Sequence, residues 1–450
     1  MRKKLKHFLP ALFFLALFLI AGFRLFNRLD LVVYQCDEYS YLRKSYFLDL
    51  YLTGNFKDKQ WQEGDARDQT KLMEYVYGIP SKTLYNKKFI DLANTNYSDW
   101  AVNYGQPASS LQISQNLKKV LYTGRMISTL FTIVYLLLAC LIVFWITDFS
   151  YLLTFFAFVF LATHPIINIH GRQVLADSGL NFFLTLGLLL LLLWWNEFWQ
   201  KRTDFRKLLC LTILSGLVGG LAAAAKLNGL LHLIISELVF MTAAALYFLK
   251  GKSDSKKHKL ITLSWLAILN ALITTGVFIG LHPNAWGNPF IEIKKFIDWR
   301  WWLTNYYRDY FPEDNIASWL QAIRLIFLRT AGFMPGVGSI GFHYETRFKS
   351  LAPAWYFFPN LVLFLAGVCH LLKESFKREG YRKMAVPILL WSLWFIILVG
   401  RYLKLDWTRY YWPLFVPFII VNSYGILLIS KLVGNIWQKY FQSVFKRIGF

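Results

Sequence analysis

The sequence has 450 residues, of which 56% are hydrophobic and 17% are charged, and its formal net charge is +23. A chain of this length would hold about three soluble domains, but soluble proteins carry about 25% charged residues. The composition also excludes a disordered, a collagen-like or a disulfide-rich chain. A strongly basic chain either binds nucleic acid or keeps its Lys and Arg in cytoplasmic loops between membrane spans. The positions of the charges decide between these two classes.

Ten stretches of the sequence are long and apolar enough to cross a bilayer, which takes about 20 residues. In chain order they are Phe8–Phe26, Leu121–Ile146, Tyr151–Ile169, Ser178–Trp195, Leu208–Ala225, Leu227–Leu249, Leu260–Leu281, Leu351–Leu372, Ala385–Val399 and Tyr410–Ser430. The sequence therefore predicts an all-α polytopic membrane protein with a bundle of about ten transmembrane helices.

Two further segments need an interpretation. The first span follows a basic start, MRKKLKH, as a signal peptide would, but it is long and no clear A-x-A cleavage site follows it. We expect it to remain as an uncleaved span. Trp319–Met334 is interrupted by Arg324 and Arg329, so we expect it to be an interfacial helix rather than an eleventh span.

The loops give the expected orientation. With ten spans, the short basic segments all fall on one side of the membrane; they are Met1–His7, Lys201–Lys207, Lys250–Lys259, Lys373–Lys383 and the tail from Lys431. Short loops rich in Lys and Arg lie in the cytoplasm. We therefore predict a multi-pass protein of the cell membrane with both termini in the cytoplasm. Because these loops hold most of the net charge, nucleic acid is not an expected partner.

The remaining long loops, residues 28–120 and 282–350, then lie on the extracytoplasmic side and mix both signs of charge. The first contains amphipathic stretches and aromatic residues that suit interfacial helices. No separate soluble domain is expected, so residues 1–450 form one membrane domain. Cys36 is the one cysteine outside the spans, so the sequence predicts neither an internal disulfide nor a cysteine metal site.

Two adjacent acids, Asp37 and Glu38, follow the first span by about ten residues. A general base for a hydroxyl acceptor must be a carboxylate held near the reacting atoms. Two neighbouring carboxylates can divide this work, one as base and one to orient the acceptor or hold a metal. An Asp-Glu dipeptide in a loop is also frequently only a solvated pair, and both interpretations stay open on the sequence alone.

Several cations are expected on the same outer side. Arg172 and Asp177 lie in a short turn between two spans, and Lys226 lies in another; Arg409 opens the last span. Arg donates two hydrogen bonds at once to phosphate, and ionisable residues close to the bilayer are candidate functional residues. Snorkelling towards lipid headgroups is the alternative role for these cations. Arg125, at the outer start of the second span, is expected to be structural.

Together, these residues suit an anionic, lipid-linked donor at the outer surface. The cations would stabilise the phosphate that leaves, and a carboxylate would deprotonate an acceptor hydroxyl. The alternative class is a transporter or flippase for a lipid-linked glycan. Such a protein would carry polar residues and broken helices at the membrane midplane.

The chain resembles the C-type membrane glycosyltransferases of the protein O-mannosyltransferase and lipid A aminoarabinose transferase superfamily. Five segments match in order: DEYSYLRKSYFLDLYLTGNF, GRMISTLFTIVYLLLACLIVFW, HPIINIHGRQVLADSGLNFFLTLGLLLLL, GLVGGLAAAAKLNGLL and RYYWPLFVPFII. The superfamily pattern has an Asp-Glu pair followed by a Tyr, here Asp37, Glu38 and Tyr41. It also has an Arg with a downstream Asp, here Arg172 and Asp177, and a Lys, here Lys226.

The resemblance implies a membrane glycosyltransferase fold and an inverting transfer of sugar from a polyprenyl-phosphate donor to a glycan, lipid or protein hydroxyl on the extracytoplasmic face. It implies Asp37 as base, with Glu38 second. Arg172, Lys226 and Arg409 would bind the donor phosphate, and Tyr41, Asp177 and Arg125 would support the site. No cofactor is implied with certainty, and a divalent cation near Asp37 and Glu38 is left open.

Overall fold

The computed structural model describes residues 2–62, 66–67, 70–85, 107–111, 113, 115–200, 202–250, 253–331, 357–376 and 384–448. Within these ranges the chain is helical apart from connecting segments. Its extended pairings there are two isolated bridges, Val33 with Pro107 and Asn315 with Leu405. The predicted all-α class is therefore confirmed.

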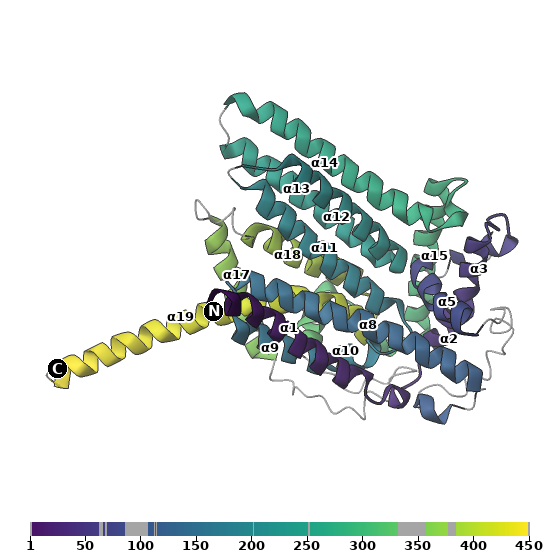
Figure 1. Ribbon diagram of the computed structural model, residues 1–450, viewed down its shortest axis with the longest axis horizontal. Coiled ribbons are helices and arrows are strands. Elements are labelled where there is room, and N and C mark those ends of the chain that lie inside the picture. Colours follow the sequence, from purple (N-terminus) through teal and green to yellow (C-terminus); the bar gives the residue numbers. More distant parts are fainter. Residues whose placement is uncertain are drawn as a thin grey trace.

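The long helices lie side by side as a bundle (Figure 1). They are α1 (Arg2–Phe26), α8 (Gln115–Ile146), α11 (Ala176–Phe198), α12 (Phe205–Ala225), α13 (Leu230–Lys250), α14 (Ser253–Gly280), α17 (Phe357–Phe376), α18 (Ala385–Tyr402) and α19 (Phe415–Ile448). Of the helices in the described ranges, 8 are long and apolar enough to cross a membrane, and they coincide with eight of the ten expected spans.

The expected span Tyr151–Ile169 is divided in the structure, which is a correction to the sequence prediction. It forms α9 (Tyr151–Thr163) and the short α10 (Pro165–His170). His164 between them is extended, and its Nδ1 accepts a hydrogen bond of 3.3 Å from the backbone N–H of Ile166. Pro165 follows at the first helical position, where its missing N–H costs nothing. The chain therefore ends one helix and caps the next within a single residue.

Two other segments are helical in the described ranges. The expected span Leu351–Leu372 corresponds to α17 from Phe357 onward, which is not among the 8 candidate spans, and residues 351–356 lie outside the described part. The segment expected as an interfacial helix forms α16 (Trp319–Thr330), which begins where Ser318 Oγ accepts the backbone N–H of Gln321 at 3.1 Å. Residues 332–334 of that segment are not described.

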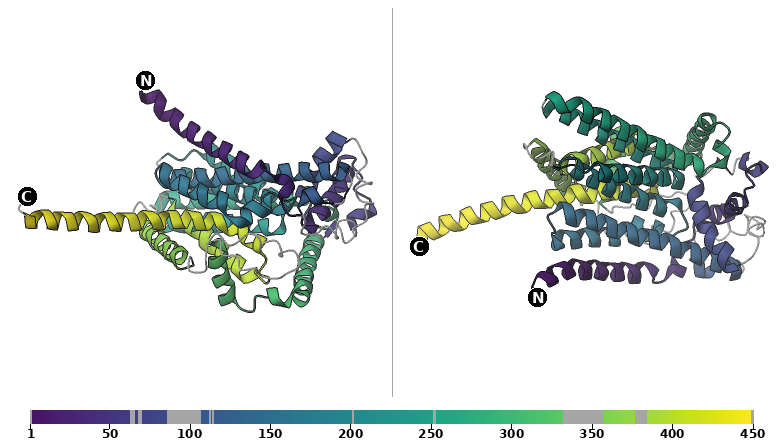
Figure 2. Two further views of the ribbon diagram at one scale, coloured as in Figure 1. Left: turned by 90° about the horizontal axis from the view of Figure 1, so that it is seen from below. Right: turned by 45° about the horizontal axis from the view of Figure 1, so that its top comes forward.

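Four helices from the two long loops lie at one end of the bundle, and both chain termini lie at the other end (Figures 1 and 2). The helices are α2 (Cys36–Arg43), α3 (Phe47–Leu52), α5 (Lys71–Tyr85) and α15 (Pro289–Tyr310). Short 3-10 turns lie between the helices: η1 (Leu29–Leu31), η2 (Lys44–Tyr46), η3 (Lys59–Gln62), η4 (Ala108–Ser110), η5 (Leu227–Gly229), η6 (Pro283–Ala285), η7 (Pro312–Asp314) and η10 (Thr408–Leu414).

Buried polar contacts hold the first loop against the second. His282 donates from Nδ1 to the carbonyl of Phe278 at 2.6 Å and accepts the backbone N–H of Lys71 at Nε2, at 3.2 Å. Burial lowers the pKa of His282 to about 3, so the ring stays neutral, as both bonds require. Lys71 also forms a fully buried ion pair of 2.7 Å with Glu74. These contacts make the outer end of the bundle one packed unit.

Candidate functional site

Asp37 and Glu38 occupy the first turn of α2, yet they face different surroundings. The helix begins with a capping box in which the Glu38 carboxylate accepts the backbone N–H of Gln35 at 3.1 Å. Successive side chains of an α-helix point about 100° apart, because the helix has 3.6 residues per turn. One acid therefore turns into the protein while its neighbour turns towards the open side.

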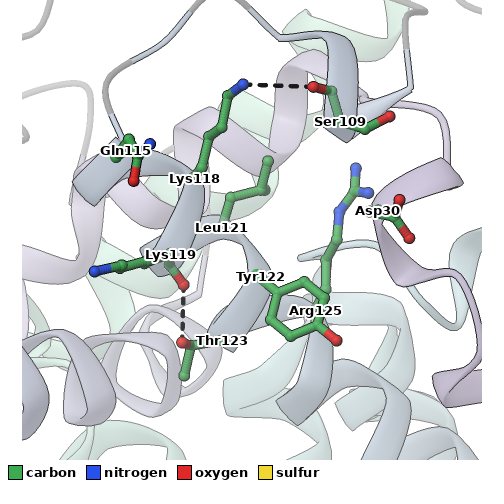
Figure 3. Close-up of a pocket in the computed structure, with 9 residues that line it drawn as sticks. All are labelled: Asp30, Ser109, Gln115, Lys118, Lys119, Leu121, Tyr122, Thr123 and Arg125. Carbon is green, nitrogen blue, oxygen red and sulfur yellow. Dashed lines mark hydrogen bonds between the residues drawn. The ribbon is translucent and has the colours of Figure 1, made fainter.

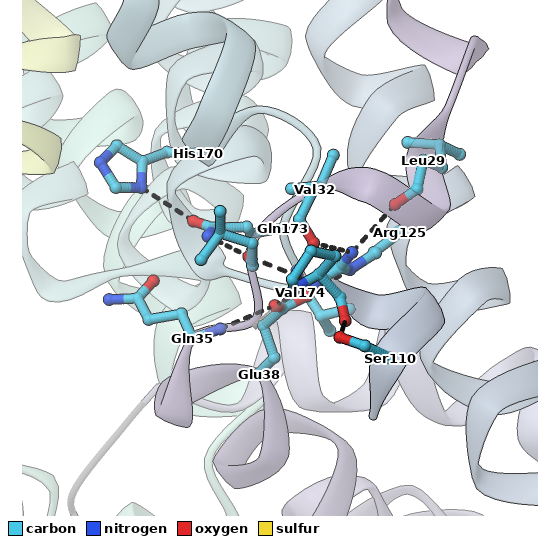
Figure 4. Close-up of polar contacts among 11 residues, drawn as sticks. Leu29, Val32, Gln35, Glu38, Ser110, Arg125, His170, Gln173 and Val174 are labelled. Carbon is cyan, nitrogen blue, oxygen red and sulfur yellow. Dashed lines mark hydrogen bonds and ion pairs between the residues drawn. The ribbon is translucent and has the colours of Figure 1, made fainter. Parts of the chain in front are cut away.

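Glu38 is the centre of a buried polar node (Figure 4). Its Oε1 lies 2.7 Å and its Oε2 2.9 Å from two nitrogens of Arg125, and both side chains are fully buried. Oε2 also accepts the backbone N–H of Val174 at 2.9 Å. Arg125 Nη1 donates to the carbonyls of Leu29 and Val32 at 2.9 and 2.8 Å. The pair joins α2, α8 and the turn before α11, which is a structural role.

Asp37 forms an ion pair with Arg409, 372 residues later in the chain. The Asp37 side chain is 29% exposed and that of Arg409 is 14% exposed. The guanidinium of Arg409 lies over two aromatic rings, 5.4 Å from the centroid of Trp407 and 5.7 Å from that of Tyr410. Asp37 is therefore a partly exposed carboxylate beside a positioned cation.

A second ion pair lies beside the first. Lys226 Nζ contacts Asp177 Oδ1 at 2.6 Å, and Asp177 lies in the first turn of α11, where the helix dipole favours a carboxylate. Lys226 is held in a tight turn after α12. A Cβ on Gly229 would lie 2.1 Å from the backbone carbon of Ala222, so only glycine allows this approach. Burial and the charge of Arg409 lower the pKa of Lys226, and Asp177 opposes them.

The two ion pairs share neighbours, so they form one cluster. Lys226 Nζ lies 5.4 Å from the ring centroid of Tyr410, the residue next to Arg409. Tyr41 is buried nearby. Its pKa is raised well above the usual value by burial and then by the carboxylates of Asp177 and Asp37, so its hydroxyl keeps its proton. We call Asp37, Arg409, Asp177 and Lys226 the outer cluster; it joins four chain segments at one end of the bundle.

Arg172 lies apart from the outer cluster. Its Nη2 donates to the carbonyl of Asn27 at 2.6 Å. Burial, and after it the charges of Arg125 and Arg24, lower its pKa to about 10; the side chain remains a cation at neutral pH. The structure thus brings together Asp37, Asp177, Lys226, Arg409 and Tyr41 of the predicted residues. It places Glu38 and Arg125 in the buried node and Arg172 beside the end of α1.

His170 connects the buried node with the outer cluster. Its Nδ1 donates to the Gln173 side-chain oxygen at 2.9 Å, and its Nε2 accepts the hydroxyl of Thr408 at 2.9 Å. Burial lowers the pKa of His170 to about 4, so the ring is neutral. Thr408 precedes Arg409, so this contact fixes the segment that presents the cluster's arginine.

Sequence reasoning missed Arg300 of α15. Its positive charge is close enough to act on both Tyr41 and Lys226, and its guanidinium makes no hydrogen bond or ion pair with a described residue. It comes from the second long loop, which mixes charges of both signs. No local spacing distinguishes Arg300 from its neighbours, so only the packing of α15 identifies it.

The two adjacent acids do not fit a divalent cation as they are arranged. Mg²⁺ takes six ligands and Ca²⁺ six to eight, mainly oxygens, among them carboxylates that are free to coordinate. Both oxygens of Glu38 already accept hydrogen bonds from Arg125 and from backbone N–H groups, and Asp37 faces a guanidinium. In the described ranges, no three His, Cys, Asp or Glu side chains gather in a metal-binding group.

A cavity of about 430 Å³ opens at the outer end of α8, beside the buried node (Figure 3). Three of its lining residues are cations and one is a carboxylate. The lining comprises Asp30, Ser109, Gln115, Lys118, Lys119, Leu121, Tyr122, Thr123 and Arg125. None of the four outer-cluster residues lines this cavity. The cavity and the outer cluster are therefore separate features, and of the buried node only Arg125 lines the cavity.

Residues 102–285 match the family model of dolichyl-phosphate-mannose-protein mannosyltransferases. No curated protein matches the sequence. Among solved structures, the chain is similar to the archaeal oligosaccharyltransferase AglB from Archaeoglobus fulgidus in complex with an inhibitory peptide and a dolichol-phosphate (13% identity, 99% of this chain, 52% of that chain, TM-score 0.52). It is also similar to the apo form of the Archaeoglobus fulgidus oligosaccharyltransferase (12% identity, 96% of this chain, 52% of that chain, TM-score 0.51).

The chain therefore spans about half the length of these two structures, and at this identity the likeness shows the fold. The family match covers η4 and all elements from α8 through η6, and it includes Asp177 and Lys226. Together they confirm the resemblance inferred from the sequence: the chain has the C-type glycosyltransferase fold, and residues 102–285 match the protein mannosyltransferase family model.

Proposed function

We propose that this protein is an inverting glycosyltransferase that moves a sugar from a polyprenyl-phosphate donor to a hydroxyl acceptor. The observation that carries the proposal is the outer cluster, in which a partly exposed carboxylate lies beside two positioned cations. The family match supports a donor of this kind, because its name describes dolichyl-phosphate-mannose as the sugar source of those relatives. The AglB structure likewise contains a dolichol-phosphate.

Asp37 is the proposed base. It is the more exposed acid of the adjacent pair, whereas both oxygens of Glu38 are occupied. In the reaction, the acceptor hydroxyl gives its proton to Asp37 and its oxygen bonds to the anomeric carbon of the donor. The bond from that carbon to the phosphate oxygen breaks, and polyprenyl phosphate leaves with the bonding electrons. Attack from the face opposite the phosphate inverts the anomeric centre.

Lys226 and Arg409 are proposed to bind the donor phosphate, because each is a mostly buried cation beside the base. Preorganised cations stabilise the charge that develops on the leaving group. Binding of the phosphate by Arg409 would also release Asp37 from its ion pair and make it available as a base. Arg172 lies apart from this cluster. In this scheme it contacts the phosphate or lipid outside the reacting centre.

The proposed orientation follows from the distribution of charge. The short basic segments would lie in the cytoplasm, and the outer cluster would lie on the extracytoplasmic side of the cell membrane. The gathering of both long loops at the end of the bundle opposite the termini supports this orientation (Figure 2). The acceptor would be a glycan, a lipid or a protein that is reached from that side.

The test is transfer by the purified full chain in lipid nanodiscs. The donors are polyprenyl phosphates that carry radiolabelled mannose, glucose, galactose or arabinose, and the acceptors are cell-envelope glycan, lipid and protein fractions. We expect label in one acceptor fraction and release of polyprenyl phosphate. If no donor yields product, the proposal is wrong. Movement of a fluorescent lipid-linked sugar across liposomes without transfer would instead establish the flippase alternative.

Two matched variants locate the phosphate site in the same assay. Lys226→Gln should raise the donor KM by about tenfold or more, since a charge-assisted hydrogen bond contributes roughly 1.5–3 kcal/mol. Arg172→Gln removes a cation outside the outer cluster and should raise the donor KM less. A larger effect from Arg172→Gln than from Lys226→Gln would move the phosphate site to the end of α1.

A further inference from the structure

Helix α15 carries an exposed ladder of aromatic rings along one flank. Trp299 and Trp302 have ring centroids 4.9 Å apart, Trp302 and Tyr306 stack at 5.7 Å, and Tyr306 and Tyr310 stack at 6.0 Å. Trp302, Tyr306 and Tyr310 are 53%, 48% and 59% exposed. We call these four residues the ring ladder. It is about 16 Å long, from a rise of 1.5 Å per residue.

The ring ladder continues into the candidate site. Tyr307 and Phe311, next to the ladder's last rings, have centroids 5.1 and 6.0 Å from that of Trp407. Trp407 in turn lies 5.5 Å from Tyr410, the ring between the two ion pairs. Arg300, on the inward face of α15, acts on Lys226. The ladder is therefore the exposed outer part of a chain of ring contacts that passes through the buried Trp407 and ends at the proposed base and phosphate site.

An interfacial belt of Trp and Tyr in the bilayer is the ordinary explanation for such rings. The helical periodicity of α15 argues against it here. A second exposed flank of the helix is apolar and lacks hydroxyl groups; it comprises Phe290, Ile297 and Trp301. Between the two flanks runs an exposed charged strip of Lys294, Asp298 and Asp309. If the apolar flank enters the bilayer, the charged strip and the ladder beyond it stay in water.

We propose that the ring ladder is the binding platform for the acceptor, and that the acceptor is a glycan chain. This inference rests on the proposed function. A sugar ring has an apolar C–H face and a rim of hydroxyls. It can lie on an aromatic ring through C–H contacts while the hydroxyls of Tyr306 and Tyr310 and the indole N–H of Trp302 bind its rim. The platform is longer than a single sugar, and it leads one end of a bound chain towards Asp37.

The matched pair Trp302→Ala and Trp301→Ala tests the platform. The two residues are adjacent, of one type and 53% and 58% exposed, but they lie on different flanks, about 100° apart around the helix. Loss of one stacked ring should raise the acceptor KM by about 2- to 13-fold in Trp302→Ala, from roughly 0.5–1.5 kcal/mol per aromatic contact. Its donor KM and kcat should stay close to the wild type, and Trp301→Ala should match the wild type in all three.

A direct binding measurement keeps this inference separate from the proposed function. Fluorescently labelled mannan, dextran, galactan and arabinan oligosaccharides are titrated against the nanodisc-embedded chain without donor. We expect at least one oligosaccharide to bind and to lose about 2- to 13-fold in affinity in Trp302→Ala only, by the same stacking contribution. Failure of sugar transfer with this binding intact would overturn the proposed function and leave the platform. Transfer that Trp302→Ala does not impair would overturn the platform alone.

Two other results would also contradict the inference. If hydroxyl-bearing peptides bind at the ladder and no oligosaccharide does, the acceptor is a protein. If brominated lipids quench the fluorescence of Trp302 more strongly than that of Trp301, judged from the signal lost in each Ala variant, the ladder lies in the bilayer.

Discussion

The two adjacent acids of α2 belong to regions with opposite properties. Glu38 pairs with Arg125 at 0% exposure of both side chains, and its oxygens are occupied by the guanidinium and by backbone N–H groups. Asp37 pairs with Arg409 at 29% and 14% exposure. Both oxygens of Glu38 already accept hydrogen bonds, so this carboxylate stabilises the fold and is not available to a ligand. The region of Asp37 keeps a carboxylate accessible beside cations, as a reacting site requires.

The largest expected effect tests the open side of this comparison. Asp37→Asn removes the proposed base and keeps its size, so the transfer rate should fall by about 10²–10⁴-fold, the contribution of general base catalysis. Transfer of radiolabelled sugar measures it. The unfolding midpoint in detergent should change little, because Asp37 is partly exposed. A variant that retains half of the wild-type rate would show that another group accepts the proton.

The next effect tests the buried side. Glu38→Gln leaves Arg125 charged and buried without a counter-ion, which should lower the free energy of unfolding by about 3–5 kcal/mol. Denaturant titration of the purified protein measures this change. The double variant Glu38→Gln with Arg125→Met removes the unpaired charge and should recover part of the loss. If Glu38→Gln is as stable as the wild type but inactive, Glu38 belongs to the chemistry instead.

The smallest expected effect is the pH dependence of the free energy of unfolding, which depends on the buried histidines His170 and His282. Burial holds the pKa of His170 at about 4 and that of His282 at about 3, whereas an unfolded histidine has a pKa of about 6.5. Between these values the unfolded chain binds protons that the folded chain does not. The free energy of unfolding should therefore fall as the pH drops from about 6.5 towards 4.

Unfolding midpoints at pH 7 and pH 5 measure this dependence. His282→Gln can still donate and accept hydrogen bonds but does not titrate, so its midpoint should vary less with pH. An equal or steeper dependence in that variant would show that His282 is not one of the groups responsible.

Much of the fold could be predicted because spans depend on local composition. An apolar stretch of about 20 residues is a helix in a bilayer, since its backbone must satisfy its own hydrogen bonds. The prediction failed at His164, where the apolar sequence continues but the helix is interrupted. There Pro165 and the capping side chain of His164 outweigh the hydropathy. Helix boundaries of this kind depend on single residues that a hydropathy average does not resolve.

The candidate site could be predicted in part. Asp37, Asp177, Lys226 and Arg409 were all expected on one side, and they do meet in pairs. Their pairing could not be predicted, because Asp37 and Arg409 are 372 residues apart. Arg172 carries the same charge as Arg409 and was expected beside the same phosphate, yet it lies against Asn27. The sequence predicted which side of the membrane these residues share, but it did not predict which of them lie next to each other.

Composition, hydropathy and the positions of Lys and Arg by themselves determined an all-helical membrane bundle and the set of charged residues from which a site could be built. These are properties of single segments in contact with lipid or water. Only the tertiary structure decided that Glu38 is buried and Asp37 is open, that Arg300 approaches Lys226, and that the rings of α15 reach Trp407. Those outcomes depend on which helix faces touch, and contact energies between distant segments leave no local pattern in the chain.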